Sequence, residues 1–258
     1  MEKRCRVVVK VGTHVLSEQN RLSKSRMLNL VEFLASLMDR YEVILVSSAA
    51  VAAGYPMLKL DKNRLHNRQA IAAIGQPQLI ATYNRKLEKY GKVAAQLLLT
   101  ADDFDSRKRS YHAKCTIETL LKHGILPIIN ENDATATEEL VFGDNDQLSA
   151  RVAHYFDAQL LILLSDIDGY YDKDPNKNSD AVMKKIVHKI DPEDLEVADE
   201  VSFVFATGGI VTKLKAADFL LKRKRDMFIA SGFDLSDIKS YMFDGVHKGG
   251  TLFTTEHS

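Results

Sequence analysis

Two polar segments near the middle of the chain hold many of the side chains that could do chemistry. Residues 130–133 read Asn-Glu-Asn-Asp, and residues 143–146 read Gly-Asp-Asn-Asp. The first segment follows the apolar run 125–129, and polar groups beyond a buried strand form ligand sites in open α/β sheets. The amides and carboxylates of the two segments suit a small polar ligand that carries an amine, or a hydrated metal ion. A pair of surface turns is the alternative, because Asn, Asp and Gly are common turn residues.

Two segments near the N-terminus could bind phosphate. Lys10 and Gly12 end a β-branched run; a lysine supplies a point charge for phosphate, and a glycine lets backbone N–H groups approach a ligand. Residues 47–54 are small, and such residues at a helix start leave its N-terminus accessible to an anion. Ser48 would lie there with its hydroxyl. A plain strand end and tight helix packing are the alternatives.

Two later segments have similar chemistry. Residues 206–213 read Ala-Thr-Gly-Gly-Ile-Val-Thr-Lys and combine backbone N–H groups, hydroxyls and a lysine, as phosphoryl transfer needs. Their spacing is not that of a Walker A loop, and no Gly-x-Gly-x-x-Gly occurs. Asp166 and Asp168 follow another apolar run and could hold Mg²⁺ or orient groups by hydrogen bonds. A surface turn is the alternative, particularly for Asp168 beside Gly169.

Alternating strands and helices must position these groups. Apolar runs predict strands at 6–11, 42–47, 93–99, 125–129, 159–164 and 227–230. Helical spacing predicts helices at 24–40, 64–87 with an interruption at 75–77, 110–123, 146–156 and 214–221. This order predicts an α/β fold with a mainly parallel sheet covered on both faces. Residues 168–199 should form loop and a short hairpin.

Composition excludes some functions. The chain has 258 residues, 45% of them hydrophobic, with 35 basic and 35 acidic side chains, so it has no general basic field for nucleic acid. No apolar stretch has membrane-spanning length, and the N-terminal apolar run is too short for a signal peptide. Cys5 and Cys115 match no metal spacing and are read as structural thiols in a reducing cytoplasm.

The chain resembles the amino acid kinase family over essentially its whole length. The resemblance rests on six segments in order: residues 9–13, 47–54, 129–137, 142–150, 165–175 and 207–217. It implies a three-layer α/β/α sandwich with a mainly parallel central sheet, the amino acid kinase fold, as a single domain over residues 1–258. The segments Ile-Asn-Glu-Asn-Asp and Gly-Asp-Asn-Asp are most similar to the members that phosphorylate L-glutamate.

The resemblance also implies an activity and its residues. ATP would phosphorylate the side-chain carboxylate of L-glutamate, giving L-glutamyl 5-phosphate, the first step of proline biosynthesis, with Mg²⁺ bound with the nucleotide rather than in a resident metal site. An N-terminal lobe of about residues 1–160 would bind glutamate, and a C-terminal lobe of about 161–258 would bind ATP. The glutamate-binding residues would be Ser48, Asp133 and Asn145. The ATP-binding residues would be Lys10, Ser165, Asp166, Thr207, Gly208, Gly209, Ile210, Val211, Thr212 and Lys213. Lys10 and Lys213 would be catalytic.

Elementary chemistry agrees with these roles. A carboxylate is already a nucleophile at neutral pH, so phosphoryl transfer to it needs positioning and neutralised charge rather than a general base. Asp133 can bind an ammonium group, Asn145 can bind a carboxylate without adding charge, and charge complementarity suggests that Asp146 holds Lys10 or Lys213.

Some features depart from the family or stay open. Ala49 and Ala206 stand where similar enzymes usually have glycine, and a methyl group at 49 restricts the backbone if a positive φ is needed there. Many relatives carry a C-terminal PUA domain, for which the chain leaves no room. Aspartate, N-acetylglutamate, carbamate or UMP as acceptor, and a binding protein without turnover, are the alternatives. The family also implies a cytoplasmic homodimer or homotetramer inhibited by proline.

Overall fold

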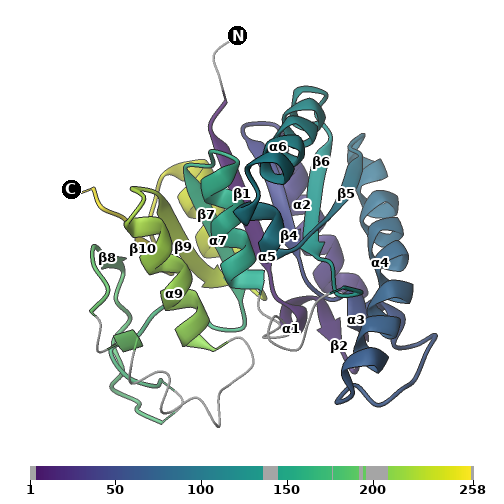
Figure 1. The fold of residues 1–258 in the computed structure, drawn as a ribbon. Helices are drawn as coiled ribbons and strands as arrows, with labels where there is room; N and C mark the ends of the chain where they lie inside the picture. Colours follow the sequence, from purple (N-terminus) through teal and green to yellow (C-terminus); the bar gives the residue numbers. More distant parts are fainter. Residues whose placement is uncertain (1–3, 136–144, 176, 192–193, 196–208, 257–258) are drawn as a thin grey trace.

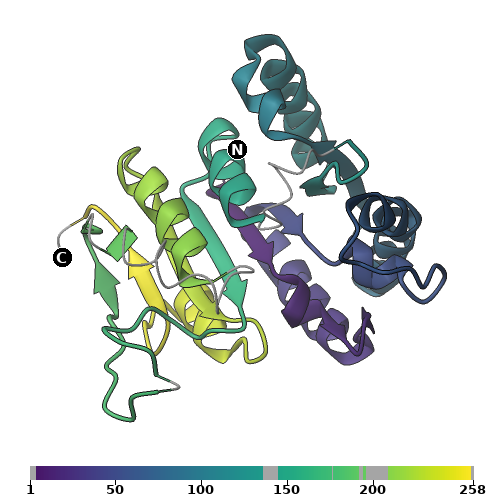
Figure 2. The same ribbon diagram turned by 60° about the horizontal axis from the view of Figure 1, so that its bottom comes forward.

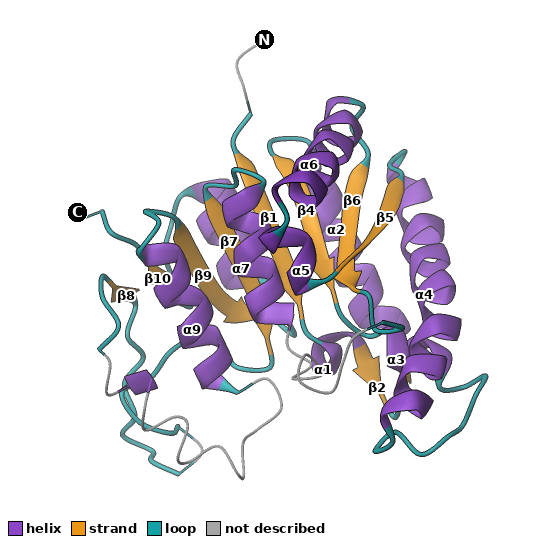
Figure 3. Ribbon diagram, viewed as in Figure 1, coloured by secondary structure: helices purple, strands orange, loops and turns teal. Residues whose placement is uncertain are grey.

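The computed structural model is a three-layer sandwich with a central β-sheet between two layers of helices (Figures 1 and 3). It describes residues 4–135, 145–175, 177–191, 194–195 and 209–256. The expected three-layer α/β/α architecture is therefore confirmed.

The central sheet has eight strands in the described part of the chain. In spatial order they are β5 (Ala94–Leu99), β6 (Leu126–Glu131), β4 (Glu42–Ser47), β1 (Arg6–Val11), β7 (Leu160–Ser165), β9 (Asp226–Ser231), β10 (Thr251–Phe253) and β8 (Ile186–Val187). The first six are parallel, whereas β10 is antiparallel to β9 and parallel to β8. A separate hairpin pairs β2 (Ser17–Glu18) with β3 (Arg21–Leu22).

Helices cover both faces of this sheet, as the turned view makes plain (Figure 2). Residues of the first core cluster come from α1 (Thr13–Leu16), α2 (Lys24–Met38), α3 (Ala50–Gly54), α4 (Leu65–Leu87), α10 (Ser236–Lys239) and the π-helix η2 (Ser240–Asp244). Residues of the second come from α5 (Ala101–Asp105), α6 (Arg107–Lys122), α7 (Asn145–Tyr155) and α9 (Ile210–Leu221). A short 3₁₀ helix, η1 (Glu88–Tyr90), follows α4.

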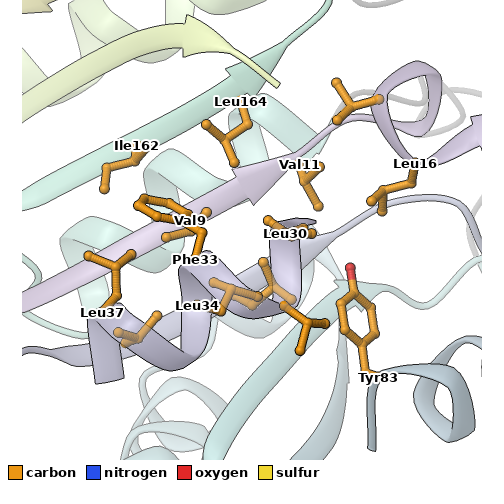
Figure 4. Packing of buried hydrophobic residues seen from close by; sticks show 14 of the residues in the cluster. Val9, Val11, Leu16, Leu30, Phe33, Leu34, Leu37, Tyr83, Ile162 and Leu164 are labelled. Carbon is orange, nitrogen blue, oxygen red and sulfur yellow. The ribbon is translucent and has the colours of Figure 1, made fainter. Parts of the chain in front are cut away.

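Alternate side chains of each strand belong to the two different cores. In β1, Val7, Val9 and Val11 belong to the core with α2 and α4, whereas Val8 belongs to the core with α7 and α9. Figure 4 shows Val9 and Val11 of β1 beside Leu30 and Leu34 of α2. Because successive strand side chains point to opposite faces, Lys10 lies on the same face as Val8. The alternation of side chains along β1 therefore places Lys10 on the face of the sheet that α7 and α9 cover.

Most expected elements are confirmed within a few residues, and two expectations are wrong. Helix α4 runs without a break through Pro77, although a proline removes one helical hydrogen bond. Two confirmed elements have shifted bounds: strand β6 continues to Glu131, and α9 begins at Ile210 rather than after Lys213. Cys5 and Cys115 are free and exposed, so they are not structural core thiols.

Close packing explains why α4 persists. A Cβ atom added to Gly75 would lie 1.8 Å from the backbone oxygen of Ala50, and one added to Gly54 would lie 2.1 Å from that of Ile71. Helices α3 and α4 therefore cross in backbone contact. The segment 75–77, interpreted as a helix breaker, is where α4 docks onto α3, and this packing outweighs the local preference.

Candidate active site

The candidate residues gather at the carboxyl ends of the central parallel strands. Strand β1 has β4 on one side and β7 on the other, and the chain reaches β7 only after it has built β5 and β6 beyond β4. Strand β1 is therefore a point where the connections diverge to opposite sides, and ligands of open α/β sheets bind at such points. Lys10 is the penultimate residue of β1 and Ser48 follows β4 directly.

One buried carboxylate joins the two lysines. The Asp146 Oδ1 atom lies 2.5 Å from Lys10 Nζ, and Asp146 Oδ2 lies 3.2 Å from Lys213 Nζ. All three residues are at most 4% exposed. The suggestion that Asp146 holds one of the lysines is confirmed in a stronger form, because it contacts both. One carboxylate cannot neutralise two ammonium groups, so part of their positive charge remains available to a bound anion.

The start of α9 completes this charged cluster. The Thr212 hydroxyl lies 3.0 Å from Asp146 Oδ2 and 2.9 Å from the backbone oxygen of Gly209. The side chain of Gln147 donates to the backbone oxygen of Thr212 at 3.0 Å, which ties α7 to α9. Ile210 and Val211 occupy the first turn of α9, and both are half-buried. Thr207 and Gly208, expected to bind ATP, lie outside the described residues, as do Ala206 and Asp144.

Gly12 is positioned differently from the expectation. Its backbone N–H donates to the oxygen of Leu164 at 3.3 Å, so this N–H serves the sheet rather than a ligand. The backbone of Gly12 is extended, with φ −77°, and it needs no left-handed conformation. A Cβ atom added there would lie 3.8 Å from Lys10 Nζ. The missing side chain therefore keeps the space beside the lysine open.

An amide joins the ends of β4 and β6 to α7. Asn145 donates through its Nδ2 atom to the Ser48 hydroxyl and to Asn130 Oδ1, each at 2.8 Å. Asn130 is 4% exposed and also accepts the backbone N–H of Glu131. Ser48 and Asn145, expected in one site, are thus brought into contact. In the sequence, Asn130 is only one residue of a polar segment, and its place directly after the apolar run 125–129 is the signal that could have identified it.

The turn after Ser48 has a left-handed backbone. Ala49 has φ 82° and ψ 15°, a region in which residues with a Cβ atom are uncommon. The sequence left open whether position 49 needs a positive φ; the structure shows that it has one, and that an alanine adopts it here. The residue is buried, and α3 begins immediately after it.

Two carboxyl groups near the end of β6 have strongly raised pKa values. Burial is the main reason that the pKa of Asp133 is raised to about 6, with the charge of Arg68 and a hydrogen bond from Gln76 pulling the other way. Burial likewise raises the pKa of Glu131 to about 7, with repulsion from Asp133 adding to it. A cation bound beside either group would offset part of the free-energy cost of burying its negative charge. Both groups would therefore bind a cation more readily than an ordinary surface carboxylate.

Ser165 and Asp166 lie at the end of β7. The Ser165 hydroxyl donates to Asp166 Oδ1 at 2.9 Å, and His14 Nδ1 lies 3.4 Å from Asp166 Oδ2. Burial alone would raise the pKa of Asp166, but these hydrogen bonds hold it below its usual range. Asp168 is exposed and accepts from the Tyr171 hydroxyl, which fits the turn interpretation for that residue.

The comparisons with known proteins agree with this geometry. The model of the amino acid kinase family matches residues 5–231. The chain belongs to the amino acid kinase family. It is 56% identical to a glutamate 5-kinase of Wolinella succinogenes, over 96% of this chain and 97% of that protein. It is 51% identical to a glutamate 5-kinase of Leishmania donovani, over 96% and 94% of the two chains.

A solved structure of isopentenyl phosphate kinase shares the family fold. It has a TM-score of 0.67 at 15% identity, and the match covers 96% of this chain and 100% of that one. At so low an identity the likeness supports the sandwich fold alone. In the described part of the chain, no group of three or more His, Cys, Asp or Glu side chains could hold a metal ion, and no helix is long and apolar enough to cross a membrane.

Proposed function

We propose that this protein transfers the γ-phosphoryl group of ATP to the side-chain carboxylate of L-glutamate, giving L-glutamyl 5-phosphate, the first step of proline biosynthesis. The observation that carries the proposal is the pairing of Lys10 and Lys213 with the single carboxylate of Asp146. Relatives at 56% and 51% identity that are named glutamate 5-kinase support the choice of acceptor.

The two lysines would act on the transferring group. Phosphoryl transfer places negative charge on oxygens between donor and acceptor, and fixed cations stabilise it without reorganisation at the moment of reaction. Lys10 comes from β1 and Lys213 from α9, so Asp146 fixes the relative position of cations from opposite ends of the sequence. Ser165, Asp166 and residues 207–213 would hold the nucleotide, with Lys10 contacting its phosphates.

The acceptor side would use Ser48, Asp133 and Asn145. The carboxylate of Asp133 would pair with the substrate ammonium group, which would lower its raised pKa. The donors of Asn145 are engaged with Ser48 and Asn130, so this amide would fix the Ser48 hydroxyl as much as contact the substrate. No general base is needed, because the attacking carboxylate is ionised at neutral pH.

The magnesium ion would arrive with ATP. Each oxygen of Asp146 already contacts a lysine, which makes this carboxylate a poor inner ligand for a metal. The ion would neutralise charge on the phosphate oxygens. Asp166, whose pKa is held below its usual range by the hydrogen bonds from Ser165 and His14, is the better candidate to orient the hydrated ion.

The segment of about residues 1–160 would bind glutamate and about 161–258 would bind ATP, within one kinase domain. A cytoplasmic homodimer or homotetramer and feedback inhibition by proline remain predictions from the family.

A panel of acceptors tests the proposal. Purified protein with ATP and Mg²⁺ is given L-glutamate, aspartate, N-acetylglutamate, carbamate or UMP, and ADP release is measured. Hydroxylamine traps acyl phosphates, so a glutamate-dependent hydroxamate is the expected product. ADP release with another acceptor, and none with glutamate, would assign a different activity to the same fold.

A further inference from the structure

A tyrosine hydroxyl lies buried behind the Ser48 turn. Tyr83 of α4 is fully buried in the core with α2, and its hydroxyl points away from α4 in Figure 4. That hydroxyl lies 2.8 Å from the hydroxyl of Ser47, the last residue of β4. Burial raises the pKa of Tyr83, so the phenol stays protonated and can donate. A phenylalanine would fill the same space without the cost of burying a polar group.

The direction of the hydrogen bonds follows from counting protons. Ser47 donates its only hydroxyl proton to the backbone oxygen of Ser48, at 3.1 Å. Tyr83 must then be the donor in its contact with Ser47. The result is a chain of two bonds from Tyr83 through Ser47 to the Ser48 carbonyl.

That carbonyl belongs to the peptide that joins Ser48 to Ala49. The backbone N–H of Ser48 donates to the oxygen of Val11 at 3.2 Å, and its side chain accepts from Asn145. The two hydrogen bonds that run from Tyr83 through Ser47 fix the carbonyl, which is the third polar group of Ser48. The positive φ of Ala49 costs energy, so the backbone at this turn would relax toward a negative φ if it were free to move. The three fixed polar groups of Ser48 oppose that relaxation.

We propose that Tyr83 is a positioning residue for acceptor binding: through Ser47 it orients the Ser48–Ala49 peptide so that the Ser48 hydroxyl faces the acceptor. The inference rests on the proposed function in one respect, namely that Ser48 binds the acceptor. Tyr83 lies near the C-terminal end of the 23-residue helix α4. The inference gives this residue a role in the substrate site in addition to core packing.

The test separates acceptor binding from stability. Tyr83→Phe removes one oxygen atom and should raise the acceptor KM about five- to ten-fold, the size expected for one hydrogen bond, with the ATP KM unchanged within about two-fold. Tyr41→Phe is the matched control, because the Tyr41 hydroxyl also donates to a backbone oxygen, that of Met242, at 3.0 Å. The control should lower the melting temperature and leave the acceptor KM at its wild-type value.

A double variant tests the path through Ser47. If Tyr83 acts through that hydroxyl, Ser47→Ala and Ser47→Ala/Tyr83→Phe should have the same acceptor KM. An unchanged KM in Tyr83→Phe, or single effects that multiply in the double variant, overturns the inference. Wild-type turnover of glutamate checks the proposed function separately. If another acceptor is used, the same ratios are measured with that acceptor.

Discussion

Asp146 and Asp133 are carboxylates at the same edge of the sheet, and the protein surrounds them in opposite ways. Asp146 is fully buried with an ammonium group against each oxygen. Asp133 is half-buried and has a pKa raised to about 6, because burial outweighs the charge of Arg68 and the hydrogen bond from Gln76. The first region therefore carries cations that are already fixed in place. The second carries an anion whose charge is incompletely compensated.

This difference would suit two groups of opposite charge, one on each proposed ligand. Fixed cations suit the phosphate oxygens of a donor, and an undercompensated carboxylate suits the ammonium group of an acceptor. If the two regions bind different ligands, a substitution in one region should leave the binding of the other ligand unchanged.

Lys213→Ala should remove most turnover while the protein stays folded. Loss of one preorganised charge at a reacting group costs about 10²–10³-fold in kcat. Asp146 keeps its contact with Lys10 at 2.5 Å, so the variant leaves no buried carboxylate unpaired. Steady-state ADP release and a melting curve check this, with the exposed Lys215 of the same helix changed to alanine as control. An unchanged kcat would remove Lys213 from the proposed role.

Asp133→Asn should raise the glutamate KM about 10- to 100-fold and leave the ATP KM unchanged within about two-fold. The amide keeps the shape of the side chain and loses the charge that pairs with the ammonium group, which is worth up to a few kcal/mol where solvent is partly excluded. Initial rates at varied glutamate and ATP give both constants. Asp105→Asn, at an exposed residue paired with Arg151, is the control. A change in the ATP constant instead would show that the two regions are assigned the wrong way round.

The glutamate KM should also rise as pH falls. With a pKa of about 6, Asp133 is mostly ionised at pH 7 and mostly protonated at pH 5, so KM should increase about ten-fold over this range. Asp133→Asn has no group to titrate at that position, and its KM should be nearly flat over the same range. A parallel rise in both proteins would assign the titration to another group.

Glu131→Gln should stabilise the protein at high pH. The pKa of Glu131 is raised to about 7 by burial and by repulsion from Asp133, so the folded state binds this proton more tightly than the unfolded chain. The charged carboxylate therefore costs stability above pH 7, and the cost is lost as pH falls through the folded-state pKa. After allowance for solvent screening, the variant should gain about 1 kcal/mol at pH 8, with a smaller gain at pH 5.

Urea unfolding at the two pH values measures this change, and Glu88→Gln at an exposed position is the control. A gain that did not shrink at pH 5 would mean that packing, and not charge, is responsible.

Ala49→Gly should have the smallest effect. Glycine removes the strain of φ 82° but loses a buried methyl group and adds freedom to the unfolded chain, so these terms should nearly cancel within about 1 kcal/mol. Ala52→Gly, inside α3, has no such strain to relieve and should destabilise by about 1 kcal/mol. Equal losses in the two variants, by thermal unfolding, would show that the left-handed alanine carries no strain.

The sequence predicted the strands well because buried parallel strands are apolar throughout, as residues 160–164 illustrate. The pairing of Asp146 with a lysine was suggested by charge complementarity alone, because the sequence does not show that this carboxylate is buried. Arg68 and Gln76 near Asp133 were not predictable, because they come from a distant helix that only tertiary packing brings close. The continuity of α4 through Pro77 was missed for the same reason.

The contact between Gly54 and Gly75 has a consequence for how this protein tolerates mutation. An added Cβ atom at either position would lie within 2.1 Å of a backbone oxygen of the other helix, and a backbone atom cannot turn aside as a side chain can. In a saturation library, these two positions should therefore accept almost nothing but glycine, although neither contacts a ligand in the proposed function. A selection for growth would rank them beside Lys10 and Lys213, and only a separate measurement of protein abundance would tell the two kinds of position apart.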